Sequence, residues 1–366
     1  MGRAVQTFAA AIAAALLLPL SAMAAPPDRR LVLVTLDGVP WTEVFKGADP
    51  ARAADRAFVA ELRETRKDFL DPPDRVRALT PFLHEIAAKQ GVLLGDRDKG
   101  SCMAVSNDQW FSYPGYNELL AGRPDPKIRS NDHGPNANTT MLEWLNRQPG
   151  FKGRVQAYAS WEAFRDILNA GRSGVPVNAG WDAASGTLLA RLQAEVPRLW
   201  PVERFDAFTH VLALEALKSR NKPRVLYIAY GDTDEFAHEG RYDQMLWAIR
   251  RTDAFLAELW KTLQADPAYA GKTTLIVTTD HGRGVGNKDA WRHHGKGVFP
   301  RSDETWLAAI GPDVIPGARP AGECGRLSQV AATALTALGL DWKAFDPAAA
   351  PPLAILKAPE RQKGAR

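Results

Sequence analysis

Three apolar runs dominate the hydrophobic pattern of the chain, and each is followed at once by polar residues. They occupy residues 30–36 (RLVLVTL), 224–230 (RVLYIAY) and 273–279 (TTLIVTT). Continuous runs of leucine and β-branched residues, without polar alternation, predict parallel strands that are buried on both faces of a sheet. Shorter strands are expected at residues 91–94, 154–159 and 305–310.

Helical patterns fill the intervals between these strands. Thr80 followed by Pro81 has the form of a helix cap, and it opens an amphipathic segment over residues 80–90. Further helices are predicted at residues 51–67, 115–121 with a start near Ser112, 139–146, 206–219, 242–264 and 327–338. The Gly-, Ala- and Ser-rich stretch 171–186 is expected to be a loop. Strands that alternate with helices predict an α/β fold, with a mostly parallel central sheet and helices on both faces.

The N-terminus has the pattern of a secretory signal. Arg3 precedes an apolar run over residues 8–20, and the small residues Ala-Met-Ala at 22–24 form a cleavage site. An uncleaved anchor is the alternative, but Pro19 interrupts the run, which is short for a spanning helix. No later segment is long and apolar enough to cross a bilayer. We therefore expect an exported protein, with the bacterial periplasm as the simplest location and no integral membrane segment after cleavage.

Composition and charge exclude only a few classes of function. The chain has 366 residues, of which 45% are hydrophobic and 24% charged, as in ordinary globular proteins. The net charge of +4 is spread among mixed acidic and basic residues, which argues against a nucleic-acid partner. Cys102 and Cys324 could pair in an oxidising compartment and brace the loop before Ser112, or remain two free thiols.

Residue types that bind divalent metals follow the three strongest predicted strands. These candidates are Asp37, Asp234, His238, Asp280, His281 and His294. Ligands bind outside the carboxyl ends of the strands in such sheets, so the six side chains are expected to lie together. Three carboxylates and three imidazoles suit two adjacent cations, which activate nucleophiles and stabilise phosphoryl or sulfuryl transfer.

Each of these short motifs has a simpler explanation when it is considered alone. Asp37 could cap a turn, and Asp232 competes with Asp234 for the role of ligand. Asp234 and His238 are four residues apart, so on a helix they share a face and could chelate one ion. Four of the seven histidines fall between residues 238 and 294, which favours a site.

Ser112 is the candidate nucleophile, at the predicted start of a helix in FSYPGYNELLAG. Backbone N–H groups at a helix start can hold an anion, and a metal lowers the pKa of a hydroxyl. A simple helix cap is the alternative. The aromatic residues around Ser112 could line a leaving-group pocket or pack in the core.

In combination, these motifs resemble the alkaline phosphatase superfamily, especially its type I phosphodiesterase/nucleotide pyrophosphatase-like branch, over roughly residues 30–310. The matching segments are VTLDGV with Asp37, SYPGYNELLAG with Ser112, Asp-x-x-x-His from Asp234, Asp-His-Gly from Asp280, and the late His-Gly of His294. The resemblance implies a catalytic domain over residues 25–350, between a signal peptide at 1–24 and a Pro-, Ala- and Lys-rich tail at 351–366 that favours disorder.

The resemblance also implies the chemistry. Asp234, His238 and His294 would hold one divalent metal. Asp37, Asp280 and His281 would hold a second, to which Ser112 would bind. Zinc is the usual metal of the family, and manganese occurs in related branches. The expected activity is hydrolysis of phosphoric mono- or diesters of small molecules through a phosphoserine.

Two departures from the family pattern affect the substrate contacts. Gly115-Tyr116 replaces the usual Asn-His, and Tyr116 also replaces the arginine of the sulfatase motif, which disfavours an ordinary sulfatase. The family asparagine that contacts the phosphoryl group could be Asn131, Asn136 or Asn138, of which Asn136 is favoured. Lys296 is the preferred cation for the terminal phosphoryl oxygens, with Arg283 and Arg292 as alternatives.

Two other functions remain open. The protein could be a non-catalytic exported metal-binding protein of the same fold, although the complete ligand set argues against this. It could also be a phosphotransferase that passes the phosphoryl group to an alcohol, although lipid-modifying enzymes of that kind carry membrane helices.

Overall fold

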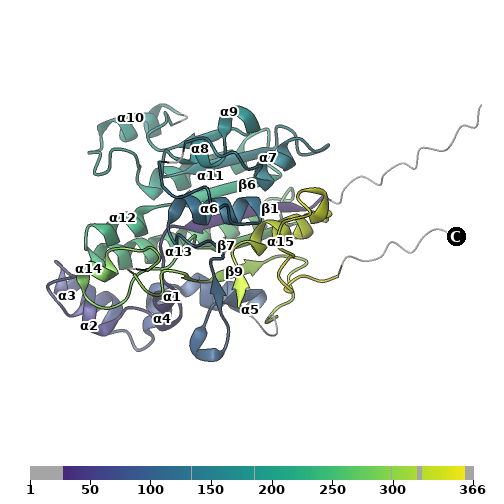
Figure 1. Ribbon diagram of the computed structural model, residues 1–366. Coiled ribbons are helices and arrows are strands. Elements are labelled where there is room, and N and C mark those ends of the chain that lie inside the picture. The colour runs from purple at the N-terminus through teal and green to yellow at the C-terminus, as the bar shows by residue number, and fades with distance from the viewer. Residues whose placement is uncertain (1–27, 133, 185, 298, 320–323, 359–366) are drawn as a thin grey trace, which may run out of the picture.

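A computed structural model describes residues 28–132, 134–184, 186–297, 299–319 and 324–358, so the expected signal peptide lies outside the described residues. A seven-stranded sheet forms its centre (Figure 1). Its strands are β1 (Arg30–Leu36), β2 (Val92–Leu94), β4 (Val155–Ala159), β5 (Val177–Ala179), β6 (Val225–Tyr230), β7 (Thr273–Thr278) and β9 (Leu307–Ile310). The order across the sheet is β2-β9-β7-β1-β6-β4-β5.

The three strongest apolar runs form the middle of this sheet. Strand β1 pairs in parallel with β6 on one side and β7 on the other, with Leu33 opposite Tyr227 and Ile276. All residues of these three strands are buried, which explains why their sequences lack polar alternation. Within this sheet, β9 alone runs in the direction opposite to the other six strands. The predicted α/β class with a mostly parallel sheet is therefore confirmed.

Two hydrophobic clusters cover the two faces of the sheet. One contains α6 (Ser112–Ala121), α7 (Met141–Asn146), α8 (Phe164–Ile167) and α15 (Gln329–Ala337). The other contains α1 (Trp41–Lys46), α4 (Arg75–Leu79), α11 (Asp206–Lys218) and α13 (Tyr242–Ala265). Alternate residues of β1 divide between them, with Leu31 and Leu33 in the first cluster and Val32 and Val34 in the second.

Short helices and turns complete the domain. They are α2 (Pro50–Ala53), α3 (Leu62–Thr65), η1 (Arg66–Leu70), η2 (Leu83–Ala87), α5 (Ala88–Gln90), η3 (Arg97–Lys99), α9 (Ala170–Ser173), α10 (Thr187–Glu195), α12 (Asp232–His238), α14 (Lys288–Trp291) and η4 (Trp342–Ala344). Figure 1 shows α12 and α14 at the end of the sheet opposite to the one where the chain enters β1. The carboxyl ends of the parallel strands therefore point toward α12 and α14.

Several predicted elements differ from the structure. The helix expected at 51–67 is broken between α2 and α3, and the loop expected at 171–186 contains most of α9 and the edge strand β5. Thr80 does not cap the helix that follows it, because its hydroxyl donates to Val44 and Val76 carbonyls. Asp253 of α13 accepts the Phe82 and Leu83 N–H groups instead.

A second, three-stranded sheet lies beside the main one. It has the order β10-β3-β8, formed by β3 (Met103–Ala104), β8 (Glu304–Thr305) and β10 (Gly325–Arg326). The disulfide Cys102–Cys324 joins the segments that lead into β3 and β10, with the two Cα atoms 4.8 Å apart. The cysteines are therefore paired, and the bridge ties the chain before Ser112 to the C-terminal region.

The C-terminal segment packs further than expected. Leu353 and Ile355 are buried, and the Ile355 carbonyl accepts a hydrogen bond from Ile315 N–H at 2.8 Å. The ordered domain therefore extends past the predicted boundary at residue 350, because these apolar side chains complete the core near α15. Residues 359–366 lie outside the described part. Among the described residues, no helix combines the length and apolar character needed to span a bilayer.

Candidate active site

The structure brings all six predicted metal ligands and Ser112 to the carboxyl edge of the sheet. Asp37 directly follows β1, Asp280 and His281 follow β7, and α12 after β6 carries Asp234 and His238. His294 lies beyond α14, and Ser112 is the first residue of α6. Segments separated by up to 257 positions (294 minus 37) thus meet at one edge, as the strand order predicts.

The first group surrounds the Nε2 atom of His281. This nitrogen lies 3.2 Å from Asp37 Oδ1, 3.4 Å from Asp280 Oδ2 and 3.3 Å from Ser112 Oγ. The other ring nitrogen, Nδ1, lies 2.8 Å from the Gly282 carbonyl, to which it can donate. That hydrogen bond leaves Nε2 as the lone-pair nitrogen, facing two carboxylates and a hydroxyl.

Buried charge in this group calls for a cation. Asp37 Oδ1 and Asp280 Oδ2 are buried and accept no hydrogen bond from the described residues. Burial, assisted by the Asp37 carboxylate, raises the pKa of Asp280 to about 8. Burial lowers the pKa of His281, but Asp280 and Asp37 outweigh it and raise that pKa to about 9. A proton on His281 or a divalent cation can supply the positive charge, so the donor set fits a metal.

The second group consists of Asp234, His238 and His294. Asp234 Oδ2 lies 2.9 Å from His238 Nε2 and 3.8 Å from His294 Nε2, and the two Nε2 atoms are 3.1 Å apart. Burial is the largest cause that lowers the pKa of His294 well below its ordinary value, followed by the nearby His281. His294 is therefore neutral, the form in which imidazole binds metals.

The two groups adjoin each other. The rings of His281 and His294 are 3.9 Å apart between centroids. Ligand atoms of Asp37, Asp280 and His281 lie within 4.8 Å of one another, and so do those of Asp234, His281 and His294. The second set shares His281 with the first, so the two donor sets are close enough for two neighbouring cations.

Arg283, predicted from sequence as an alternative cation for the phosphoryl oxygens, is instead buried against Asp234 of the second group. Its guanidinium contacts Asp234 Oδ1 and donates to the Arg292 carbonyl at 2.9 Å. Burial lowers the pKa of Arg283 to about 9. Glycine is favoured at position 38, where φ is 60°, because a Cβ would lie 2.3 Å from Asp234 Oδ1 and 2.8 Å from this guanidinium. Arg283 therefore orients Asp234 and leaves its Oδ2 for the histidines.

Tyr116 and Gly115 account for the departure from the family pattern after Pro114. The Tyr116 hydroxyl donates to Asp37 Oδ2 at 2.8 Å, so it holds the carboxylate whose other oxygen faces His281. A Cβ on Gly115 would lie 2.5 Å from the Asp280 carbonyl oxygen, so only glycine permits α6 to approach this closely.

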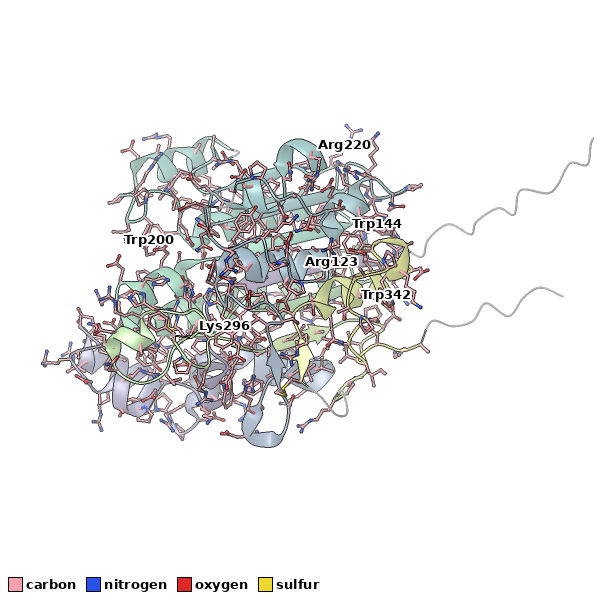
Figure 2. All side chains as sticks on the ribbon, in the orientation of Figure 1. Arg123, Trp144, Trp200, Arg220, Lys296 and Trp342 are labelled. Atoms are coloured by element: carbon pink, nitrogen blue, oxygen red, sulfur yellow. A yellow bond between two sulfur atoms is a disulfide. The ribbon has the colours of Figure 1, made fainter. Side chains whose placement is uncertain are left out.

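The two predicted substrate-contact residues differ in position. Asn136 is fully buried, and its amide donates to Asn117 and to the Ile167 carbonyl, within a loop network away from Ser112. Asn131 is nearer, since its Oδ1 accepts the N–H of Tyr113, the residue after Ser112, at 3.0 Å. Lys296 follows His294 and Gly295, and Figure 2 places it toward the α14 end of the molecule, away from Trp342.

A cavity of about 480 Å³ opens beside His294. Its walls come from the loop before Ser112 and the loop after His294, with a contribution from the chain after α6. It is lined by Asp108, Gln109, Phe111, Arg129, His294, Gly295, Lys296 and Phe299. A volume of this size is typical of sites for small molecules.

Comparison with known proteins agrees with this geometry. A model of the type I phosphodiesterase/nucleotide pyrophosphatase family matches residues 180–296, which include Asp234, His238, Asp280, His281 and His294. No curated protein matches the chain in sequence. The predicted resemblance to this branch of the alkaline phosphatase superfamily is confirmed.

Solved structures show the same fold at low sequence identity. An inactive variant of murine ectonucleotide pyrophosphatase/phosphodiesterase 5 in complex with AMP is 14% identical, with 88% of this chain and 96% of that chain covered and a TM-score of 0.54. The lipoteichoic acid synthase LtaP from Listeria monocytogenes is 11% identical, with coverage of 86% and 73% and a TM-score of 0.54. A suspected sulfatase from Bacteroides thetaiotaomicron is 13% identical, with coverage of 86% and 71% and a TM-score of 0.53.

Proposed function

Because the chain has the fold of the alkaline phosphatase superfamily and two groups of potential metal ligands adjoin Ser112, we propose that it is a metal-dependent hydrolase of phosphoric esters. Family and fold support a hydrolase of phosphate or sulfate esters. Tyr116 favours phosphate, because its hydroxyl is engaged with Asp37 where the sulfatase motif has arginine. The observation that carries the proposal is the convergence of Asp37, Asp280 and Ser112 on His281 Nε2.

Two divalent cations, most simply zinc, would be held by the two groups and would supply electrophilic stabilisation of the reacting oxygens and a lowered pKa for the serine hydroxyl. Ser112 Oγ is the nucleophile. It forms a bond to phosphorus, the bond from phosphorus to the ester oxygen breaks, and water then hydrolyses the phosphoserine.

Asn131 is assigned the phosphoryl contact in place of Asn136. Its side chain is anchored next to Ser112 through Tyr113 N–H, whereas the Asn136 amide is committed to Asn117 and Ile167. Lys296 remains a candidate substrate-binding cation, since it lines the cavity that borders His294. An exported location accompanies the proposal, and the disulfide Cys102–Cys324 supports an oxidising compartment.

Turnover and metal dependence test this function together. The purified protein is incubated with p-nitrophenyl phosphate and bis(p-nitrophenyl) phosphate, after EDTA treatment and after addition of Zn²⁺ or Mn²⁺. Hydrolysis of at least one ester should disappear with EDTA and return with metal. Absence of turnover in every arm would contradict a hydrolase and support a non-catalytic metal-binding protein.

The role of Ser112 requires a separate measurement. Ser112→Ala should lower kcat at least about a thousandfold, because the covalent route is removed, while bound metal is retained. Ser106→Ala is the matched control, since Ser106 hydrogen-bonds to Ser328 and not to the site. Equal activity of Ser112→Ala and the control would remove Ser112 from the mechanism. Net transfer of phosphate to added glycerol, without release of inorganic phosphate, would favour a phosphotransferase.

A further inference from the structure

The cavity beside His294 has a rigid wall on the side of Ser112. Asn107 Oδ1 accepts the N–H groups of Gln109 and Trp110, both at 2.9 Å, and Asn107 is itself held by the buried Glu118 carboxylate. The backbone N–H of Lys296 donates to the Gln109 carbonyl at 3.0 Å, which joins this loop to the one after His294. The cavity is thus built by two connected loops.

Two cations line the cavity and face a single carboxylate, that of Asp108. Among the described residues, the Arg129 guanidinium and the Lys296 ammonium form no hydrogen bond or close ion pair, and the charge that both feel in the cavity is that of Asp108, whose pKa is lowered by the Gln109 amide and by both cations. Asp108 is the only carboxylate in the lining, and its own Oδ1 accepts from the Gln109 amide. Two cations and one carboxylate leave a net charge of +1 without counting His294, so the cavity favours an anionic group.

Position identifies which part of a substrate the cavity would hold. In an in-line displacement the leaving oxygen departs on the side opposite to the nucleophile. Ser112 lies against the Asp37, Asp280 and His281 group, whereas the cavity opens at His294, in the other group. A leaving group that points from Ser112 toward His294 would extend into this cavity, where Phe111 and Phe299 offer apolar contact surface.

Resting on the function proposed above, we propose that this cavity is a leaving-group subsite that selects esters whose leaving group is planar and carries a negative charge of its own. Arg129 and Lys296 bind that charge, and the two phenylalanines pack against the flat part. During turnover the ester oxygen leaves as a phenolate and takes its proton from water, so the second charge does not take part in the bond changes. Arg129 and Lys296 are specificity residues, not groups that act on phosphorus.

Two isosteric substrates measure this selection directly. They are 4-carboxyphenyl phosphate and 4-carbamoylphenyl phosphate, which differ in charge but hardly in shape. The readout is the charge-selection ratio, which is kcat/KM for 4-carboxyphenyl phosphate divided by kcat/KM for 4-carbamoylphenyl phosphate. The two phenols differ in acidity, but this difference cancels when the ratio is compared between variants. Arg129→Gln and Lys296→Gln should each lower the ratio about fivefold, as expected for one partly exposed charge pair. Arg129→Glu should lower it further.

Lys152→Gln is the control, since Lys152 is exposed and precedes β4 at the amino edge of the sheet. The charge-selection ratio of Lys152→Gln should equal that of the unaltered protein. In a second control, 0.5 M NaCl should screen the cavity cations and lower the ratio of the unaltered protein toward the ratio of Arg129→Gln. If the ratio is the same in the unaltered protein and in all three cavity variants, the proposed subsite is wrong, but the proposed hydrolase function is unaffected. Absence of turnover of both substrates would overturn the proposed function, and the subsite with it.

Discussion

Tyr116 shows how a single side chain adapts the site. Its hydroxyl donates to Asp37 Oδ2 at 2.8 Å, while the other oxygen of Asp37 faces His281. A hydrogen bond to a metal-binding carboxylate fixes its orientation, and loss of such bonds typically weakens metal binding 10–100-fold. From sequence, Tyr116 could be seen to break the family pattern, but nothing in the pattern indicated that it would contact Asp37.

We predict that Tyr116→Phe lowers the affinity for zinc about 10–100-fold, measured by competition with a chromogenic chelator. Tyr269→Phe is the matched control, because its buried ring precedes β7 at the amino edge and its hydroxyl donates to the Pro223 carbonyl at 3.1 Å. Equal zinc affinity in the two variants would show that the Tyr116 hydroxyl does not support the metal group.

Motif spacing could identify the candidate metal ligands, because metal binding is restricted to a few residue types. Asp37, Asp280 and His281 follow strong strands, so both their type and their place at the sheet edge could be inferred. Arg283 and Asn131 could not be assigned in this way, because their contacts with Asp234 and Tyr113 depend on how loops fold over the edge.

At the scale of elements, the start of the helix over η2 and α5 is stabilised from a distant helix. Asp253 of α13 accepts the N–H groups of Phe82 and Leu83 at 2.7 and 3.1 Å, and burial raises its pKa to about 7. In the unfolded chain the pKa is near 3.9. Between these values the folded protein holds a proton that the unfolded chain lacks, so this group contributes less stability as the pH rises from about 4 to 7.

Asp253→Asn removes the ionisable group, so the variant does not lose this stability as the pH rises. The free energy of unfolding of the variant minus that of the unaltered protein should therefore increase by roughly 2–4 kcal/mol from pH 5 to pH 8. Urea unfolding at both pH values measures the change. Asp243→Asn, on the same helix, is the control: the pKa of Asp243 is lowered because hydrogen bonds to Arg241 and backbone N–H groups outweigh burial. Its effect should not vary over this range. A pH-independent difference for Asp253→Asn would contradict the assignment.

Elements with one strong pattern were predictable, and elements shaped by packing were not. The bounds of β1 match the apolar run at 30–36, because burial on both faces leaves a continuous signal. The segment 51–67 is compatible with a helix in composition, but residues between α2 and α3 instead contact α13, as in the hydrogen bonds from Ala60 and Glu61 N–H to Asp243. The edge strand β5 has only three residues and no distinctive pattern.

For the whole molecule, the disulfide links segments 222 residues apart, beside the chain that leads to Ser112. Removal of a bridge between distant residues typically costs about 2–5 kcal/mol, because the unfolded chain regains freedom. Replacement of both Cys102 and Cys324 by serine should therefore lower the melting temperature by several degrees. Dithiothreitol should lower the melting temperature of the unaltered protein by the same amount and leave the melting temperature of the double variant unchanged. If neither the substitution nor dithiothreitol changes the melting temperature, the disulfide has no stabilising role.

The overall architecture followed from the sequence because parallel strands place their carboxyl ends together. Asp37, Asp234 and Asp280 each come shortly after a buried strand, so one topological rule gathers them. The antiparallel direction of β9 and the small sheet of β3, β8 and β10 could not be derived, since they depend on connections with no local signal.

The most direct test of the account is the position of bound metal at the site. Crystals grown with Zn²⁺ and measured at the zinc absorption edge should show two anomalous peaks about 4 Å apart. One peak should lie among Asp37, Asp280 and His281, next to Ser112 Oγ, and the other among Asp234, His238 and His294. Absence of peaks at this edge of the sheet, or peaks only at surface histidines elsewhere, would contradict the two-metal site on which the proposed hydrolase depends.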